Sequence, residues 1–197
     1  MALAAPAAGA QQASGKHPAA ASALDPGAVE NGVYRNPLLG FECSVPAGWV
    51  LQTAQMANDQ ARAGNVVLLS AFERAPHSAG AGVNSSIVIA AESQSSDPDV
   101  DTPLGYLVLL KEAAHQGGLE LAQPPRETRV AQRMLWRADF ASDPEASPGL
   151  SRYQISEVML ARGYFVSFTF IADTQQDAET LLSNLHFSMQ RSARPQR

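Results

Sequence analysis

RYQISEVMLARGYFVSFTFI, residues 152–171, decides the fold because it predicts two long strands joined by a tight turn. Gly163 suits that turn, since glycine takes positive φ without a Cβ clash. If Ala161 pairs with Tyr164, one face of the hairpin carries apolar side chains and a single acid, Glu157. The apolar members of this face are Tyr153, Ile155, Met159, Tyr164, Val166, Phe168 and Phe170. We expect this face in the core and the mixed opposite face to be partly covered.

The composition is typical of a globular chain. At 197 residues we expect one domain with a sizeable core. The net charge is −5 and no basic patch with interleaved aromatic residues occurs, so we expect no nucleic-acid partner. No apolar run approaches the roughly 18 residues of a membrane-spanning helix, so we expect no transmembrane segment. The sequence does not indicate an oligomeric state.

Cys43 is the only cysteine, so the chain can form no internal disulfide and no zinc site built from thiolates. It alternates with Phe41 and Val45 in a short predicted strand. Two interpretations are open, a nucleophilic or redox-active thiol and a small buried apolar side chain. The second is favoured, because free cysteine is among the most buried residue types.

Residues 1–28 differ from the rest of the chain. Twelve of them are alanine, and no aromatic residue precedes Tyr34. Such a segment has too little large apolar surface to offset the entropy of ordering, so we expect a disordered leader. A single α+β domain is then expected over residues 29–190, followed by a basic tail over residues 191–197.

Two origins of the leader remain open. The residues Ala8-Gly9-Ala10 match a small-residue cleavage pattern, but the charged and apolar parts of a signal peptide are largely missing. The leader is therefore either the tail of an export signal or only an alanine-rich segment. The first interpretation predicts an exported protein, periplasmic or extracellular, and the second a cytoplasmic one.

The pattern G-x-Y-x-N-x-x-x-G-F, a short alternating strand and then P-x-G-W, occupies residues 32–49. It resembles the opening of PsbP-like domains. The residues that carry the resemblance are Gly32, Tyr34, Asn36, Gly40, Phe41, Pro46, Gly48 and Trp49. The later order of elements extends the resemblance over about residues 30–190. The motif is structural rather than catalytic.

This resemblance implies a fold and a class of function. PsbP-like domains include the extrinsic photosystem II subunit PsbP, a Ran-binding nuclear-import factor and many bacterial exported proteins. The implied role is a binding or assembly module with a protein partner. No partner-binding residues of the photosystem or Ran-binding members can be matched here, so neither partner is transferred.

Hydrophobic periodicity predicts the remaining elements. Predicted strands cover residues 41–45, 66–72, 86–91 and 129–141, and predicted helices cover residues 104–116 and a stretch from about Thr174. Residues 52–64 are predicted to form either a short helix or a loop. Strands in hairpins with interspersed helices indicate an α+β domain with an antiparallel sheet. The resemblance adds a three-layer α/β/α sandwich, with helices on both faces.

The sequence holds no motif that carries chemistry by itself. It has no phosphate-binding loop, no G-x-S-x-G elbow and no H-E-x-x-H helix, so we expect no cofactor and no metal. Asp97, Asp99 and Asp101 alternate as in a calcium loop, but the required glycine and closing glutamate are absent. No two histidines lie at helical i,i+4 spacing; they are His17, His77, His115 and His186.

Glu157 is the most unusual polar residue because its strand face is otherwise apolar, and desolvation there raises a carboxyl pKa. It is either a general acid or a structural carboxylate paired with an arginine of a neighbouring strand. Two functions therefore stay open. One is a non-catalytic, exported binding or assembly module. The other is a small hydrolase-like enzyme whose site is assembled from scattered residues such as His77, Asp139 and Glu157.

Overall fold

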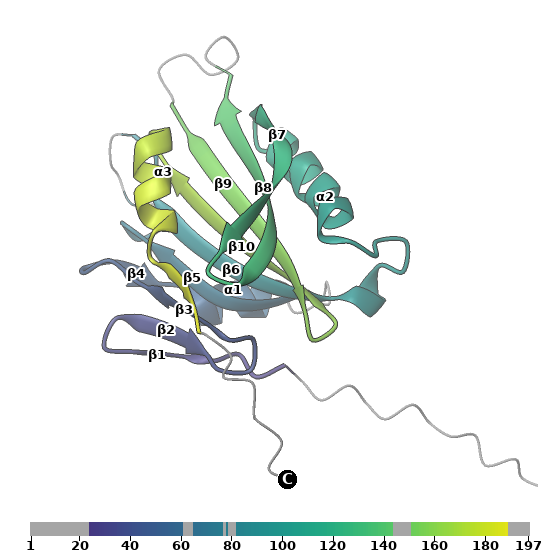
Figure 1. The fold of residues 1–197 in the computed structure, drawn as a ribbon. Coiled ribbons are helices and arrows are strands. Elements are labelled where there is room, and N and C mark those ends of the chain that lie inside the picture. Colours follow the sequence, from purple (N-terminus) through teal and green to yellow (C-terminus); the bar gives the residue numbers. More distant parts are fainter. Residues whose placement is uncertain (1–23, 61–64, 77, 79–81, 144–150, 189–197) are drawn as a thin grey trace, which may run out of the picture.

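The structure is a computed structural model that describes residues 24–60, 65–76, 78, 82–143 and 151–188. Within these residues, a seven-stranded antiparallel sheet has the order β4-β5-β6-β10-β9-β8-β7 (Figure 1). Its strands are β4 (Val50–Leu51), β5 (Asn65–Phe72), β6 (Ser86–Ser93), β7 (Leu119–Val130), β8 (Arg133–Ser142), β9 (Tyr153–Ala161) and β10 (Tyr164–Ala172). A four-stranded sheet of order β1-β2-β3-β11 lies beside it. Its strands are β1 (Ala28–Glu30), β2 (Val33–Asn36), β3 (Phe41–Ser44) and β11 (Leu185–Phe187).

The hairpin formed by β9 and β10 lies near the middle of the large sheet. Ala161 pairs with Tyr164 and Glu157 pairs with Phe168, so the predicted register is confirmed. The turn residues Arg162 and Gly163 have φ of 55° and 79°. Two consecutive positive φ values are typical of the two-residue turns that match the twist of paired strands. The positive φ of Arg162 was not predicted.

The predicted apolar face of this hairpin forms the main core with the small sheet and the last helix, α3 (Gln175–Leu182). Phe168 on β10 meets Phe41 on β3 edge to face, with ring centroids 4.9 Å apart. Ala178 and Leu181 of α3 are buried in the same cluster. The core therefore joins residues from both ends of the chain.

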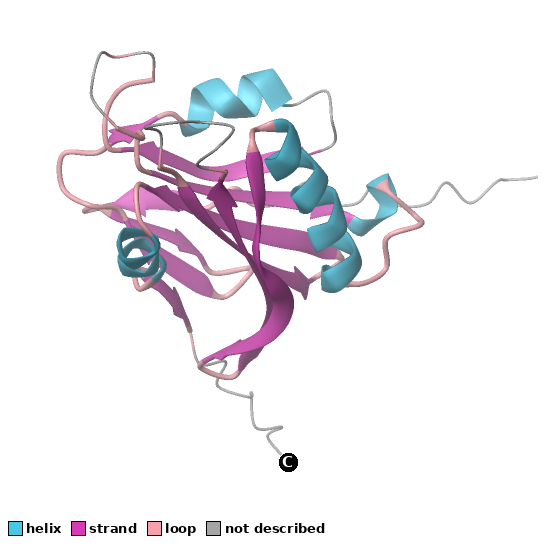
Figure 2. Cartoon of the chain, turned by 90° about the horizontal axis from the view of Figure 1, so that it is seen from above, coloured by secondary structure: helices cyan, strands magenta, loops and turns pink. Residues whose placement is uncertain are grey.

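The opposite face of the large sheet is covered by α1 (Thr53–Gln60) and α2 (Pro103–Gln116) (Figure 2). A 3₁₀ turn, η2 (Gln94–Ser96), precedes α2. Tyr106 of α2 stacks on Phe165 of β10 with ring centroids 5.0 Å apart. Helices thus lie on both faces of an antiparallel sheet, which confirms the predicted α+β class. On the α3 side, the outer layer also contains the small sheet.

Both predicted helices are present: α2 begins one residue before the predicted start at Leu104, and α3 follows Thr174. The hydroxyl of Thr102 caps α2 by accepting a hydrogen bond from the Gly105 backbone N–H, at 3.1 Å. The helix ends before Gly118, whose φ is 77°. Thr174 caps α3 by accepting a hydrogen bond from the Asp177 backbone N–H, at 3.1 Å. These contacts satisfy backbone donors that a helix start leaves without partners.

The opening motif fixes the segment that precedes β1. The Tyr34 hydroxyl donates a hydrogen bond to the Pro26 carbonyl at 2.7 Å, and the Asn36 amide donates to the Asp25 carbonyl at 3.0 Å. Leu24 is buried in the main core. Contacts of the domain therefore extend to Leu24. Residues 1–23 and 189–197 lie outside the described residues, so the leader and tail stay predictions.

Most of β7 was not predicted from the sequence. Strand structure was predicted only from residue 129, whereas β7 begins at Leu119 and contains Pro124 and Pro125. Proline cannot donate a hydrogen bond to a neighbouring strand, so it argues against a central strand. β7 lies at the edge of the large sheet, next to β8 alone, and its pairing is irregular between Leu121 and Arg126. An edge position tolerates both prolines.

Trp49 precedes β4 and is half-buried against the main core. We expect Trp49→Ala to lower the free energy of unfolding by about 2–4 kcal/mol, somewhat less than a fully buried aromatic would lose. Leu51→Ala, at a residue that is 47% exposed, is the control and should change it by less than about 1 kcal/mol. Urea denaturation measures both. Equal small effects would place Trp49 outside the cooperative core.

Cys43 is fully buried in β3, and burial raises the pKa of its thiol to about 12. Because the thiolate is the reactive form, we expect no labelling by a thiol reagent at pH 8 while the protein is folded. Labelling should be fast in denaturing urea. Fast labelling of the folded protein would favour the reactive-thiol interpretation instead.

Candidate functional site

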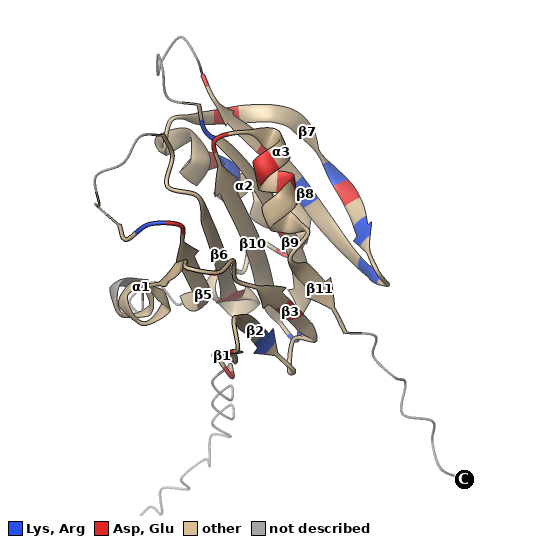
Figure 3. Cartoon of the chain, turned by 90° about the vertical axis from the view of Figure 1, so that its left-hand side faces the viewer, with Lys and Arg blue, Asp and Glu red and all other residues tan. Residues whose placement is uncertain are grey.

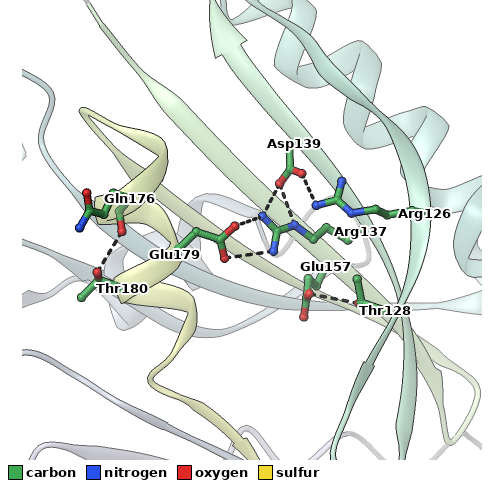
Figure 4. A network of polar contacts seen from close by, with 8 residues as sticks. All are labelled: Arg126, Thr128, Arg137, Asp139, Glu157, Gln176, Glu179 and Thr180. Carbon is green, nitrogen blue, oxygen red and sulfur yellow. Dashed lines mark hydrogen bonds and ion pairs between the residues drawn. The ribbon is translucent and has the colours of Figure 1, made fainter.

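A network of charged side chains lies between α3 and the strands β7, β8 and β9, on the core side of the sheet (Figure 4). Figure 3 shows acidic residues on α3 and basic residues along β7 and β8, the elements that the network joins. Arg137 on β8 is the cross-strand partner of Glu157 on β9, so the two side chains lie on one face. The members are Arg126, Thr128, Arg137, Asp139, Glu157 and Glu179.

Arg137 is the centre of this network, and its side chain is 8% exposed. Its Nε donates to Asp139 Oδ1 at 2.8 Å. Its two terminal nitrogens donate to the two carboxylate oxygens of Glu179 on α3, at 3.1 and 2.5 Å. Burial opposes the charged guanidinium, but the hydrogen bonds to Glu179 and Asp139 outweigh it and raise the pKa of Arg137. Arg137 is therefore charged and binds α3 to the sheet.

Asp139 is fully buried and contacts two guanidinium groups. Besides Arg137, its Oδ2 lies 2.6 Å from Nη2 of Arg126 on β7. That contact is an ion pair without the alignment of a hydrogen bond. A buried carboxylate between two guanidinium groups is fixed in position by both contacts. Asp139 therefore joins β7 to β8 and has no oxygen free of a cation.

Glu157 is only 1% exposed and lacks such a cation contact. Its Oε1 accepts a hydrogen bond from the Thr128 hydroxyl at 3.2 Å, whereas its Oε2 has no hydrogen-bond partner. Burial raises the pKa of this carboxyl, and the positive charge of Arg137 opposes the effect only in part. The charges of Glu179 and Asp139 raise the pKa further. The predicted position on the apolar face and the raised pKa both agree with the structure.

Of the three candidate residues from the sequence, the structure describes Asp139 and Glu157. Asp139 and Glu157 lie on neighbouring strands within the one network, with no hydrogen bond between them. His77 lies outside the described residues, so its part in any site stays a prediction. The arginines and Glu179 were not predicted as members. The alternation of β8 gave a partial signal, because it places Arg137 and Asp139 on one face.

Three hollows on the described surface have volumes of about 290–330 Å³, and neither Glu157 nor Asp139 lines any of them. One lies beside Trp49 and the start of α3 and has three acidic residues in its wall, Glu73, Asp173 and Asp177. Across the described residues, no group of three or more His, Cys, Asp or Glu is arranged to hold a metal ion. Nor is any described helix long and apolar enough to cross a membrane.

No protein-family model and no curated protein matches the sequence. Among solved structures, the chain is similar to the cyanobacterial PsbP protein CyanoP from Synechocystis sp. PCC 6803. The match has a TM-score of 0.51 and 15% identity, and it covers 79% of this chain and 91% of CyanoP. The chain has a PsbP-like fold. A weaker match, with a TM-score of 0.42 and 13% identity, is LpqN, described as involved in cell envelope biogenesis of Mycobacterium tuberculosis; it covers 76% of this chain and 83% of LpqN.

The opening motif of this PsbP-like fold has structural roles. Asn36 is fully buried, and its Oδ1 accepts a hydrogen bond from the Leu39 backbone N–H at 2.9 Å. Gly40 has φ of 75°, and a Cβ there would lie 2.8 Å from the guanidinium of Arg133, near the tip of the β7–β8 hairpin. The motif therefore fixes the β2–β3 turn against that hairpin. The resemblance inferred from the sequence is confirmed at the level of fold.

Arg137→Met tests the centre of the network. The variant leaves Asp139 and Glu179 without their main cation, and we expect it to lower the free energy of unfolding by about 3–5 kcal/mol. The control is Arg129→Met at an exposed residue of β7, for which we expect a change below about 1 kcal/mol. Chemical denaturation at pH 7 compares the two. Similar small losses would mean that the network contributes little to stability.

Glu157→Gln tests the raised carboxyl pKa through the pH dependence of stability. Because the folded-state pKa exceeds the ordinary value of 4.5, the folded protein binds this proton more tightly than the unfolded chain does. The wild type should therefore lose stability as pH rises from about 4.5 through the folded-state pKa. The variant should lack this loss and stay within about 1–3 kcal/mol of the wild type. Parallel pH profiles of the two proteins would contradict a raised pKa.

Proposed function

We propose that the chain is a non-catalytic, exported binding or assembly module that attaches to a protein partner. The observation that carries this proposal is a set of large apolar side chains left exposed beside α2, on the sheet face opposite the charged network. They are Leu104, Val108, Met134 and Leu160, with exposed fractions of 38%, 61%, 47% and 42%. Clustered exposed apolar side chains mark interaction sites on soluble proteins.

The four residues come from three neighbouring elements. Leu104 and Val108 are four residues apart on α2 and so lie on one side of that helix. Met134 and Leu160 each lie two residues beyond the cross-strand pair Trp136–Val158, so they share the α2-covered face with that pair. Val158 is buried under α2, whereas Met134 and Leu160 are exposed. The exposed residues are therefore at the margin of the layer that α2 covers.

The charged network supports a structural role better than a catalytic one. Both oxygens of Asp139 and both oxygens of Glu179 contact arginines, so neither carboxylate is available as a base. A raised carboxyl pKa would suit Glu157 to general-acid chemistry, which is the basis of the hydrolase-like alternative. However, Glu157 lines none of the hollows described above and is covered on all sides. A substrate has no described route to it.

The proposal that the protein is exported rests on the small-residue pattern Ala8-Gly9-Ala10 within the alanine-rich leader. N-terminal sequencing of the protein isolated from its native source tests it. A mature chain that begins just after Ala10 would support export. A chain that retains these residues and fractionates with the cytoplasm would contradict it.

Val108→Glu tests the binding surface by placing a charge among the exposed apolar residues. The matched control is Ala113→Glu, at an exposed residue on another side of the same helix. We expect the wild type and the control to retain one common partner from a native extract and Val108→Glu to retain at least tenfold less, with unchanged melting temperatures. Equal retention by all three proteins would contradict a role for this surface. Metal analysis of the same samples tests the expected absence of a bound metal.

A further inference from the structure

Arg137 lies between the carboxyl groups of Glu157 and Glu179, and of these two it bonds only to Glu179. Glu179 on α3 holds it by two hydrogen bonds, and the Glu179 side chain is 41% exposed. Glu157 is the direct cross-strand partner of Arg137 on β9, and Cβ atoms of such pairs lie about 4.5–5.5 Å apart. Yet Glu157 accepts no hydrogen bond from Arg137, and its Oε2 has no partner at all. A second acceptor is therefore within reach of the same guanidinium.

The charges of the network balance only if Glu157 is neutral. Two guanidinium groups, those of Arg126 and Arg137, face three carboxyl groups, those of Asp139, Glu157 and Glu179. Asp139 and Glu179 each contact an arginine directly, so these two pairs account for both positive charges. An ionised Glu157 would add one uncompensated negative charge in a buried place, where such a charge is costly.

The remaining neighbours of Glu157 offer little compensation. Thr128 on β7 donates one hydrogen bond, and Phe168, its partner on β10, is apolar. On β9 itself, the adjacent residues on the same face of the strand are Ile155 and Met159, which are both apolar. Within the part of the chain that the structure describes, the positive charge that lowers the pKa of this carboxyl is that of Arg137. An ionised Glu157 must therefore draw on the cation that already holds α3.

We propose that Glu157 and Glu179 compete for Arg137, so that ionisation of Glu157 loosens the attachment of α3 to the sheet. In its neutral form Glu157 leaves the guanidinium to Glu179, and α3 is held. In its charged form it shares or takes the guanidinium, and Glu179 turns to the solvent that it already partly faces. The attachment of α3 is then weaker at higher pH.

The fold makes α3 sensitive to such a change. The helix has eight residues, and an isolated helix of that length is not stable in water. It is also attached through the buried side chains of Ala178 and Leu181 and the partly buried side chain of Leu182. Burial raises the pKa of Glu157, which moves its ionisation toward neutral pH. Loosening of α3 would expose part of the main core, because α3 covers β9 and β10.

Amide hydrogen exchange measured between pH 5 and 8, corrected for intrinsic rates, tests the proposal on the full chain. In the wild type, the protection of α3 amides should fall by about tenfold as pH rises over this range, which corresponds to a loss of about 1.4 kcal/mol in the free energy of opening. Protection of α2 amides should stay constant. In Glu157→Gln, protection of α3 should be high and independent of pH. In Glu179→Gln it should be low throughout.

Glu112→Gln, on the exposed surface of α2, is the matched control and should behave as the wild type. Constant α3 protection in the wild type would overturn the proposal, as would a fall of equal size in Glu157→Gln. Should that variant fail to fold, carboxyl NMR titration of the wild type replaces it. Ionisation of Glu157 at an ordinary carboxyl pKa, or without a change in α3 resonances, would then overturn the proposal.

Discussion

The structure depends on the pairing of Arg137, a guanidinium that the sheet places on its core side. A buried charge must be neutralised where it lies, because it cannot reach water. Asp139 comes from the same strand, and Glu179 comes from a helix 42 residues further along the chain. The position of α3 thus follows from an electrostatic requirement as well as from the burial of its apolar side chains. The pairing of Arg137 therefore contributes both to the stability of the fold and to the position of α3.

The two faces of the large sheet have different characters. On the α3 side, the small sheet and the helix close over a continuous core, and Arg137 there is paired with Asp139 and Glu179. On the opposite side, α1 packs on β5 and α2 packs on β7, β8 and β9, and apolar side chains stay exposed beside α2. The first face has contacts that hold the domain together. The second face has surface that a partner could cover.

Local signals in the sequence were sufficient for much of this fold. The turn at Gly163 and the strict alternation around it gave the register of the central hairpin, and hydrophobic periodicity gave α2 and α3. The signals failed where tertiary context decides. Pro124 argued against a strand over β7, because nothing in the local sequence indicates that a strand lies at the edge of a sheet. The partners of Glu157 were not predictable either, since Arg137 and Glu179 approach it only after folding.

Pro124 and Pro125 have a consequence for how this protein can associate. An exposed edge strand offers a row of unpaired backbone groups, and proteins commonly join there by adding a strand to the sheet. Two prolines and an irregular ladder in β7 remove donors from that row. At this edge the chain is therefore protected from backbone-mediated joining, including the indiscriminate kind that leads to aggregates. A partner that binds at this edge must then be selected by side chains, whose shape and chemistry differ between proteins, rather than by the backbone, which all proteins share.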